Sequence, residues 1–137
     1  MSFYKIKIDQ SDKIFSQYIR LRDKKCQRCG SFVKFNGVGM PISHQASHFH
    51  GRAHEGTRVE PDNAICLCWG CHNYFHANPN EYVIWKKKQL GEKRFKTLDL
   101  QAHQFCKRDR KLALITARFL LKTLKKEERK GRKKNNK

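Results

Sequence analysis

Residues 61–72 read Pro61-Asp-Asn-Ala-Ile-Cys-Leu-Cys-Trp-Gly-Cys-His72, an apolar run that leads into a group of cysteines and a histidine. The first part of this segment, residues 62–68, predicts a short strand, and a helix is expected to begin near Cys71 and to run to about His76. Residues 42–50 predict another short strand upstream, and the polar segment between the two strands predicts a loop. The pattern therefore predicts two strands followed by a helix.

Four of the six cysteines form two Cys-x-x-Cys pairs, Cys26/Cys29 and Cys68/Cys71. Each pair has the spacing that lets two thiolates of one turn bind a tetrahedral zinc ion. We therefore predict one closed structural zinc site with four sulfur ligands, which would also support a domain too small to bury a large core. A thioredoxin-like redox motif and unrelated buried thiols are the alternative interpretations. Cys66, outside the pattern, is interpreted as a small core residue.

Histidines gather around the same segment. His72 follows Cys71 directly, and His76 comes four residues later, so that on a helix both rings share one face and can bind one metal ion. A pair of surface histidines is the alternative interpretation of this spacing. Upstream lies His48, at the end of the first predicted strand, and Asn63 stands between His48 and His72 in the sequence.

His48, Asn63 and His72 resemble the three signature positions of the HNH (ββα-metal) nuclease motif. The segment 61–72 resembles the second half of that motif in the members that carry zinc, in which two Cys-x-x-Cys pairs also bracket the hairpin. The resemblance implies an α+β fold, with a small ββα-metal core, a zinc knuckle of four cysteines, and flanking helices.

A narrower resemblance, to the phage NinG (Rap) recombination proteins, covers most of the chain. It rests on residues 12–23, on Cys26-x-x-Cys29-Gly30, on Ala46-Ser-His-Phe49, and on Arg52 with Thr57-Arg58. Those proteins act on branched recombination intermediates. The resemblance implies cleavage of branched or single-stranded DNA in phage recombination or DNA processing.

The resemblance also implies a role for each signature residue. His48 would be the general base, because a neutral imidazole with a pKa near ~6.5 can take the proton of the attacking water. Asn63 would hold the loop of the hairpin and orient the His48 ring by a hydrogen bond. His72 and His76 would bind a catalytic divalent cation (Mg²⁺, Mn²⁺ or Zn²⁺) that neutralises charge on the phosphoryl group. In-line attack would leave a 5′-phosphate and a 3′-hydroxyl.

The chain departs from the family at the residue before the general base. That residue is usually an Asp or His that binds the metal, whereas here it is Ser47, a poor ligand. His76, His50 and His44 are the candidates to replace it. A catalytically inactive, zinc-stapled nucleic-acid-binding protein is therefore the alternative function.

The formal net charge of +19, from 31 Lys and Arg against 12 Asp and Glu, predicts a polyanionic partner. Nucleic acid is the leading candidate, and a ribosomal or membrane-surface role is the alternative. Arg52, Arg58 and the run Lys86–Lys88 are candidate phosphate contacts, although the lysine run fits a solvated helix face equally well. A homodimer would suit a two-fold DNA junction.

The chain divides into an N-terminal strand and helix (1–25), the nuclease core (26–78), a helical extension (79–124) and a disordered basic tail (125–137). No stretch resembles a signal peptide or is apolar enough to span a bilayer, so we expect no membrane partner and a cytoplasmic location, that of the host cell if the chain is phage-encoded. The expected elements outside the core are a strand over 3–8, a helix over 12–23 capped by Ser11-Asp12, a helix from Asn80 to Gly91, and helices within 92–106 and 109–126.

Overall fold

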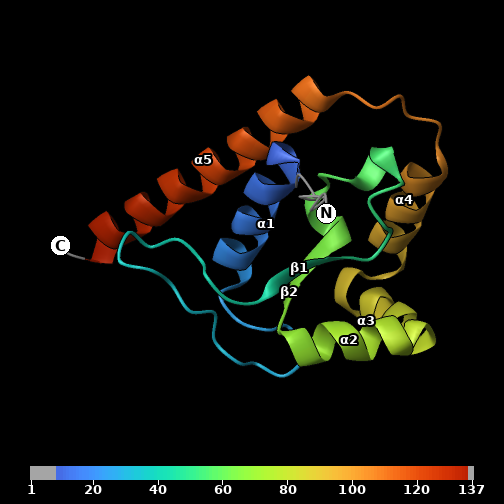
Figure 1. Cartoon of the computed structure of the whole chain (residues 1–137), viewed down its shortest axis with the longest axis horizontal. Helices are drawn as coiled ribbons and strands as arrows, with labels where there is room; N and C mark the ends of the chain where they lie inside the picture. The colour runs from blue at the N-terminus through green and yellow to red at the C-terminus, as the bar shows by residue number, and fades with distance from the viewer. Residues whose placement is uncertain (1–8, 136–137) are drawn as a thin grey trace, which may run out of the picture.

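The computed structural model describes residues 9–135, with side chains up to residue 131. This part of the chain is mixed α+β, with five α-helices and one two-stranded antiparallel sheet (Figure 1). The elements in chain order are α1 (Gln10–Asp23), β1 (Gln45–His48), η1 (Glu55–Thr57), η2 (Pro61–Asn63), β2 (Ala64–Leu67), α2 (Trp69–Ala77), α3 (Pro79–Leu90), α4 (Glu92–His103) and α5 (Arg110–Asn135).

Helix α1 confirms the predicted helix, but not its predicted cap. The carboxylate of Asp9 accepts hydrogen bonds from the backbone N–H (2.9 Å) and the hydroxyl of Ser11 (2.6 Å), so Asp9 rather than Ser11-Asp12 is the N-cap. Asp12 is instead buried within the first turn. Phe15 and Ile19, four residues apart and fully buried, form the face of α1 that packs against the hairpin.

The two strands form an antiparallel hairpin in which His48 lies opposite Ala64 and Gln45 opposite Leu67. Both strands are shorter than predicted. His44 has a left-handed backbone (φ +65°), which ends extended pairing before Gln45, and the chain leaves β1 directly after His48. All of β2 is buried, and its alternate residues face two different cores. Ala64 and Cys66 pack with α1, whereas Ile65 and Leu67 pack with α2 and α3. Cys66 is thus a core residue, as predicted.

Helices α2 and α3 lie on the far side of the hairpin from α1 (Figure 1). Helix α2 begins at Trp69, two residues before its predicted start, because Cys68 serves as its N-cap. The next helix begins at Pro79, whose fixed φ suits the first helical position, with Asn78 as N-cap instead of Asn80. It ends at Leu90, and Gly91 (φ +80°) is its C-cap, at the predicted end of the helix.

Helix α5 lies along α1 and continues to Asn135 (Figure 1). The predicted disordered tail over 125–137 is therefore wrong for residues 125–135. The segment is rich in Lys, Arg and Glu, which are good helix formers, and Glu128 pairs with Lys24 at 3.2 Å. The predicted strand over 3–8 and residues 136–137 lie outside the described residues. No helix in the described part combines the length and apolar content of a membrane span.

Candidate functional site

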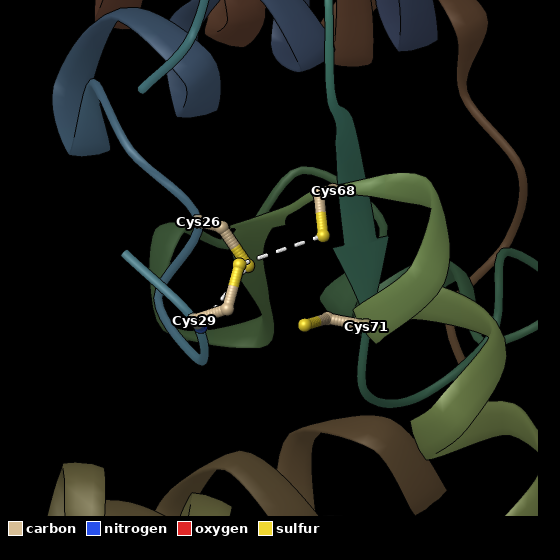
Figure 2. A group of neighbouring side chains, drawn as sticks. All are labelled: Cys26, Cys29, Cys68 and Cys71. Carbon is tan, nitrogen blue, oxygen red and sulfur yellow. Dashed lines mark hydrogen bonds between the residues drawn. The ribbon is translucent and has the colours of Figure 1, made fainter. Parts of the chain in front are cut away.

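The four predicted metal-binding cysteines come together. Cys26 and Cys29 lie in the loop after α1, and Cys68 and Cys71 lie at the start of α2. Their sulfur atoms all lie within 4.8 Å of one another, and those of Cys29 and Cys68 are 3.7 Å apart (Figure 2). Around a tetrahedral zinc ion with Zn–S bonds of 2.3 Å, neighbouring sulfurs would be about 3.8 Å apart. This group can therefore hold a metal ion such as zinc.

The loop that carries Cys26 and Cys29 is fixed by backbone hydrogen bonds. The Gly30 N–H donates to the Cys26 carbonyl at 2.9 Å, and the left-handed backbone of Gly30 (φ +79°) lets the loop turn back there. The Gln27 N–H donates to the Cys66 carbonyl at 2.9 Å, which attaches the loop to β2. These bonds place one cysteine pair opposite the other.

The environment of the sulfurs differs from one cysteine to the next. Hydrogen bonds with Ser31 lower the pKa of the Cys29 thiol to about 6, whereas burial raises that of Cys71 to about 12. The guanidinium of Arg28 donates a hydrogen bond to the Cys71 sulfur at 3.4 Å and lies over the Tyr74 ring. Zinc binds thiolates, so metal binding would release protons from this group, and Arg28 would offset part of the resulting negative charge.

A cavity of about 420 Å³ lies between the end of β1 and helices α2 and α3. It is lined by His48 from the end of β1, by His72 and His76 from α2, and by Ser47 and Tyr82. The structure thus brings four of the predicted histidines to one space, because His50, a candidate to replace the ligand missing at Ser47, also lines this cavity. A second cavity, of about 430 Å³, is also lined by His48 and His72 and has a basic border of Lys13, Arg20 and Arg52.

The His48 ring is held by a backbone carbonyl. Its Nε2 atom lies 2.9 Å from the Arg58 carbonyl oxygen, which can only accept a hydrogen bond. Nε2 therefore carries the proton of the neutral ring, and Nδ1 is the basic nitrogen. Burial lowers the pKa of His48, which keeps the ring neutral near pH 7.

Arg58 does not serve as the phosphate contact that its position in the sequence suggested. Its guanidinium is held by Asp12, with nitrogen–oxygen distances of 3.0 and 2.6 Å, and by Glu55 at 3.0 Å. Asp12 and Arg58 are 6% and 12% exposed. This buried ion pair fixes the backbone segment whose carbonyl holds His48. Sequence reasoning missed the pair, because no local pattern connects two residues so far apart in the chain.

Asn63 is fully buried and holds the loop after β1. Its side chain donates to the carbonyls of His50 (2.9 Å) and Thr57 (3.0 Å) and accepts from the His50 N–H (2.9 Å). These are the loop contacts that the sequence predicted. The predicted hydrogen bond to the His48 ring is wrong, because Arg58 supplies that bond instead.

Ser47 and His72 line the same cavity, but of these two side chains only that of Ser47 has a hydrogen-bond partner there within residues 9–131. The Ser47 hydroxyl lies 3.2 Å from that of Tyr82, whose pKa burial raises to about 12, so that the phenol stays protonated. The Nδ1 atom of His72 is buried and has no hydrogen-bond partner among the described residues. It is therefore available to a metal ion. His44, by contrast, bonds Ser43 and Ser31 through its two ring nitrogens.

The run Lys86–Lys88 divides into one buried and two exposed residues. Lys86 is completely buried and donates to the Gln89 side chain at 2.8 Å, so its predicted role as a phosphate contact is wrong. Burial lowers its pKa to about 8. Lys87 and Lys88 are exposed and can reach a ligand.

No protein-family model matches this chain, and no curated protein or solved structure matches it either. Within the described residues, the site consists of the cysteine group and the histidine-lined cavity. The two are joined at α2, where Cys71 and His72 are adjacent.

Proposed function

We propose that this protein is a metal-dependent DNA endonuclease of the HNH (ββα-metal) type, stapled by a structural zinc ion on Cys26, Cys29, Cys68 and Cys71. The observation that carries the proposal is that His48 and His72 line one cavity. They reach it from the end of β1 and the first turn of α2, which is the arrangement that an HNH centre requires.

His48 acts as the general base. Its Nδ1 atom takes a proton from water, because the Arg58 carbonyl holds Nε2 in the protonated form. The water oxygen then forms a bond with the phosphorus as the bond between phosphorus and the 3′ oxygen breaks. The departing 3′ oxygen takes a proton from a second water molecule, so the products are a 5′-phosphate and a 3′-hydroxyl.

His72 and His76 would hold the catalytic divalent cation. The buried Nδ1 atom of His72 has no other partner in the described part of the chain, and the His76 side chain lines the same cavity. Such a cation supplies charge neutralisation on the phosphoryl oxygens and on the leaving oxygen. The Ser47 hydroxyl lies against that of Tyr82, so His72 and His76 are the two residues proposed to hold the cation.

Charge supports DNA as the substrate. Lys13, Arg20 and Arg52 border the second cavity beside the same two histidines, and the whole chain carries a net charge of +19. Cations in these positions would neutralise the phosphates that flank the scissile bond. The proposed substrate class is branched or single-stranded DNA. The proposed process is phage recombination or DNA processing.

The competing function is an inactive, zinc-stapled protein that binds nucleic acid. Ser47 favours it, because a serine in place of an Asp or His removes one metal ligand. Both functions require the zinc group and the basic surface. Cleavage is therefore the property that separates them.

The test compares cleavage of four-way junction, flap, single-stranded and linear duplex DNA in Mg²⁺ or Mn²⁺. His48→Ala should lower kcat by about 10²–10⁴-fold, the typical contribution of a general base. Zinc content and DNA affinity should not change. Asn73→Ala, an exposed change on α2 next to His72, is the matched control and should cleave normally. If the wild type binds these DNAs but cleaves none of them, the endonuclease proposal is wrong and the binding protein is favoured.

A further inference from the structure

A second group of histidines lies next to the site described above, and one of its members, His50, also lines the first cavity. His50 follows β1, His54 precedes η1, and His103 lies in the last turn of α4, one turn after Asp99. The ring centroids are 5.7 Å (His50–His54), 5.8 Å (His50–His103) and 5.7 Å (His54–His103) apart. Three imidazoles from three segments thus form a nearly equilateral triangle.

The size of this triangle suits a metal ion. With Zn–N bonds of about 2.1 Å and tetrahedral angles, three ligating rings would have centroids roughly 5 Å apart. The rings meet edge to face rather than stacked, with interplanar angles of 62–83°. Among the described residues, only the four cysteines bring their ligand atoms within 4.8 Å of one another. The ring nitrogens must therefore move closer together to close a site, and the 63% exposed side chain of His103 has room to move.

Hydrogen bonds already set two of the rings in the metal-binding tautomer. The Nδ1 atom of His54 lies 3.0 Å from the Ala102 carbonyl oxygen, and that of His103 lies 2.8 Å from the Asp99 carbonyl oxygen. Carbonyls only accept, so both Nδ1 atoms carry the proton and both Nε2 atoms keep a free lone pair. Metal-binding histidines commonly donate their other ring nitrogen to a carbonyl in this way.

The third ring supplies a nitrogen that lacks a partner. The Nε2 atom of His50 is buried and has no hydrogen-bond partner in the part of the chain that the structure describes. It lies 3.6 Å from a carboxylate oxygen of Asp99. A buried polar atom without a partner is costly, and a metal ion shared by His50 and Asp99 would remove this cost.

Close packing holds the contributing segments together. A Cβ atom at Gly56 would collide with the carbonyl oxygen of Gln101, so only glycine lets η1 approach α4 so closely. Asn63 fixes the backbone of His50 through two hydrogen bonds. The ligands therefore come from segments whose backbones are already in place.

We propose that His50, His54 and His103, together with Asp99, bind a zinc ion distinct from that of the cysteine group and from the cation on His72 and His76, although His50 also lines the cavity of that second site. Three imidazole nitrogens and one carboxylate oxygen are a typical ligand set for Zn²⁺. The ion would tie the loop after β1 to α4. This site does not depend on nuclease activity.

The test measures bound zinc in untagged protein that carries His72→Ala and His76→Ala, so that the proposed catalytic site contributes none. This background should bind one zinc ion more per chain than the same protein with His54→Gln and His103→Gln added. His44→Ala, a histidine outside the group, is the matched control and should not lower the zinc content. When cobalt replaces zinc, the cysteine group should give thiolate charge-transfer bands in both proteins. The protein that keeps His54 and His103 should show, in addition, the weak visible absorption of a site with nitrogen and oxygen ligands.

A second measurement needs no variant of the group. The imidazole ¹⁵N resonances of His54 and His103 should shift at Nε2 when zinc is added to the same background. Equal zinc contents with and without the two glutamines would overturn the proposal, as would ring resonances that do not respond to zinc.

Discussion

The carbonyl oxygen of Arg58 lies 2.9 Å from the Nε2 atom of His48. The Arg58 side chain is in turn paired with Asp12, a buried residue in the first turn of α1. Through this chain of contacts, α1 supports a ring at the end of β1, although α1 contributes no catalytic residue of the proposed nuclease. Asp12 is thus a positioning residue for His48.

Asp12→Asn should weaken this support. The substitution leaves the buried Arg58 guanidinium without a charged partner, and we expect the free energy of unfolding to fall by about 3 kcal/mol. Asp12 also raises the pKa of His48, so its loss should move the acid limb of kcat/KM to lower pH. Urea titration and a pH–rate profile would measure the two effects. Glu55→Gln, which removes the more exposed partner of Arg58, should cost less stability. An unchanged acid limb in Asp12→Asn would show that the Asp12 charge does not act on His48, and an unchanged stability would contradict the supporting role of the Asp12–Arg58 pair.

The pH dependence of cleavage should reflect the burial of His48. Burial lowers its pKa below the usual 6.5, and the neutral ring is the active base. We therefore expect kcat/KM to rise with pH below ~6.5, as His48 loses its proton, and to be on its plateau at neutral pH. A rate profile over roughly pH 5 to 8 would show this. An acid limb centred clearly above ~6.5 would indicate a different base.

Local sequence patterns predicted α1 to α4, the first part of α5 and the cysteine group, because apolar spacing and Cys-x-x-Cys spacing are properties of neighbouring residues. They also placed His48 and His72 at the ends of the right elements. They missed contacts between distant segments: the pair Asp12–Arg58 and the ring of His103 beside His50 depend on how α1 and α4 pack. No repeat or spacing in the sequence predicts how these helices pack against the rest of the chain.

Cys68→Ser should remove zinc and unfold the core around α2. The substitution takes away one of four converging sulfurs, and structural zinc contributes directly to folding. Zinc content should fall, and the thermal transition should shift down or lose its cooperativity. Cys106→Ser is the matched control, because Cys106 is exposed and lies outside the group. It should keep both zinc and stability, and a Cys68→Ser protein with wild-type zinc content would show that the four sulfurs do not share an ion.

Lys86 is buried and its neighbour Lys87 is exposed, so substitution by methionine should have different effects on stability and on DNA binding at the two positions. Lys86 is completely buried with a pKa lowered to about 8, so its charged form is unfavourable in the folded state. Lys86→Met should therefore raise the free energy of unfolding at pH 7 by about 1–3 kcal/mol without changing DNA affinity. Lys87→Met removes an exposed charge and should weaken DNA binding, with a shallower dependence on salt.

The sign of the Lys86 effect can be checked by pH. Between about pH 8 and the ordinary lysine pKa of 10.5, the unfolded chain holds a proton that the folded chain has lost, so the wild type gains stability as pH rises. Lys86→Met has no such proton, and its advantage over the wild type should shrink across this range in urea titrations. If the advantage stays constant from pH 7 to 10.5, the amine does not titrate with a lowered pKa. The buried lysine would then be held by its contact with Gln89 and would carry its charge throughout.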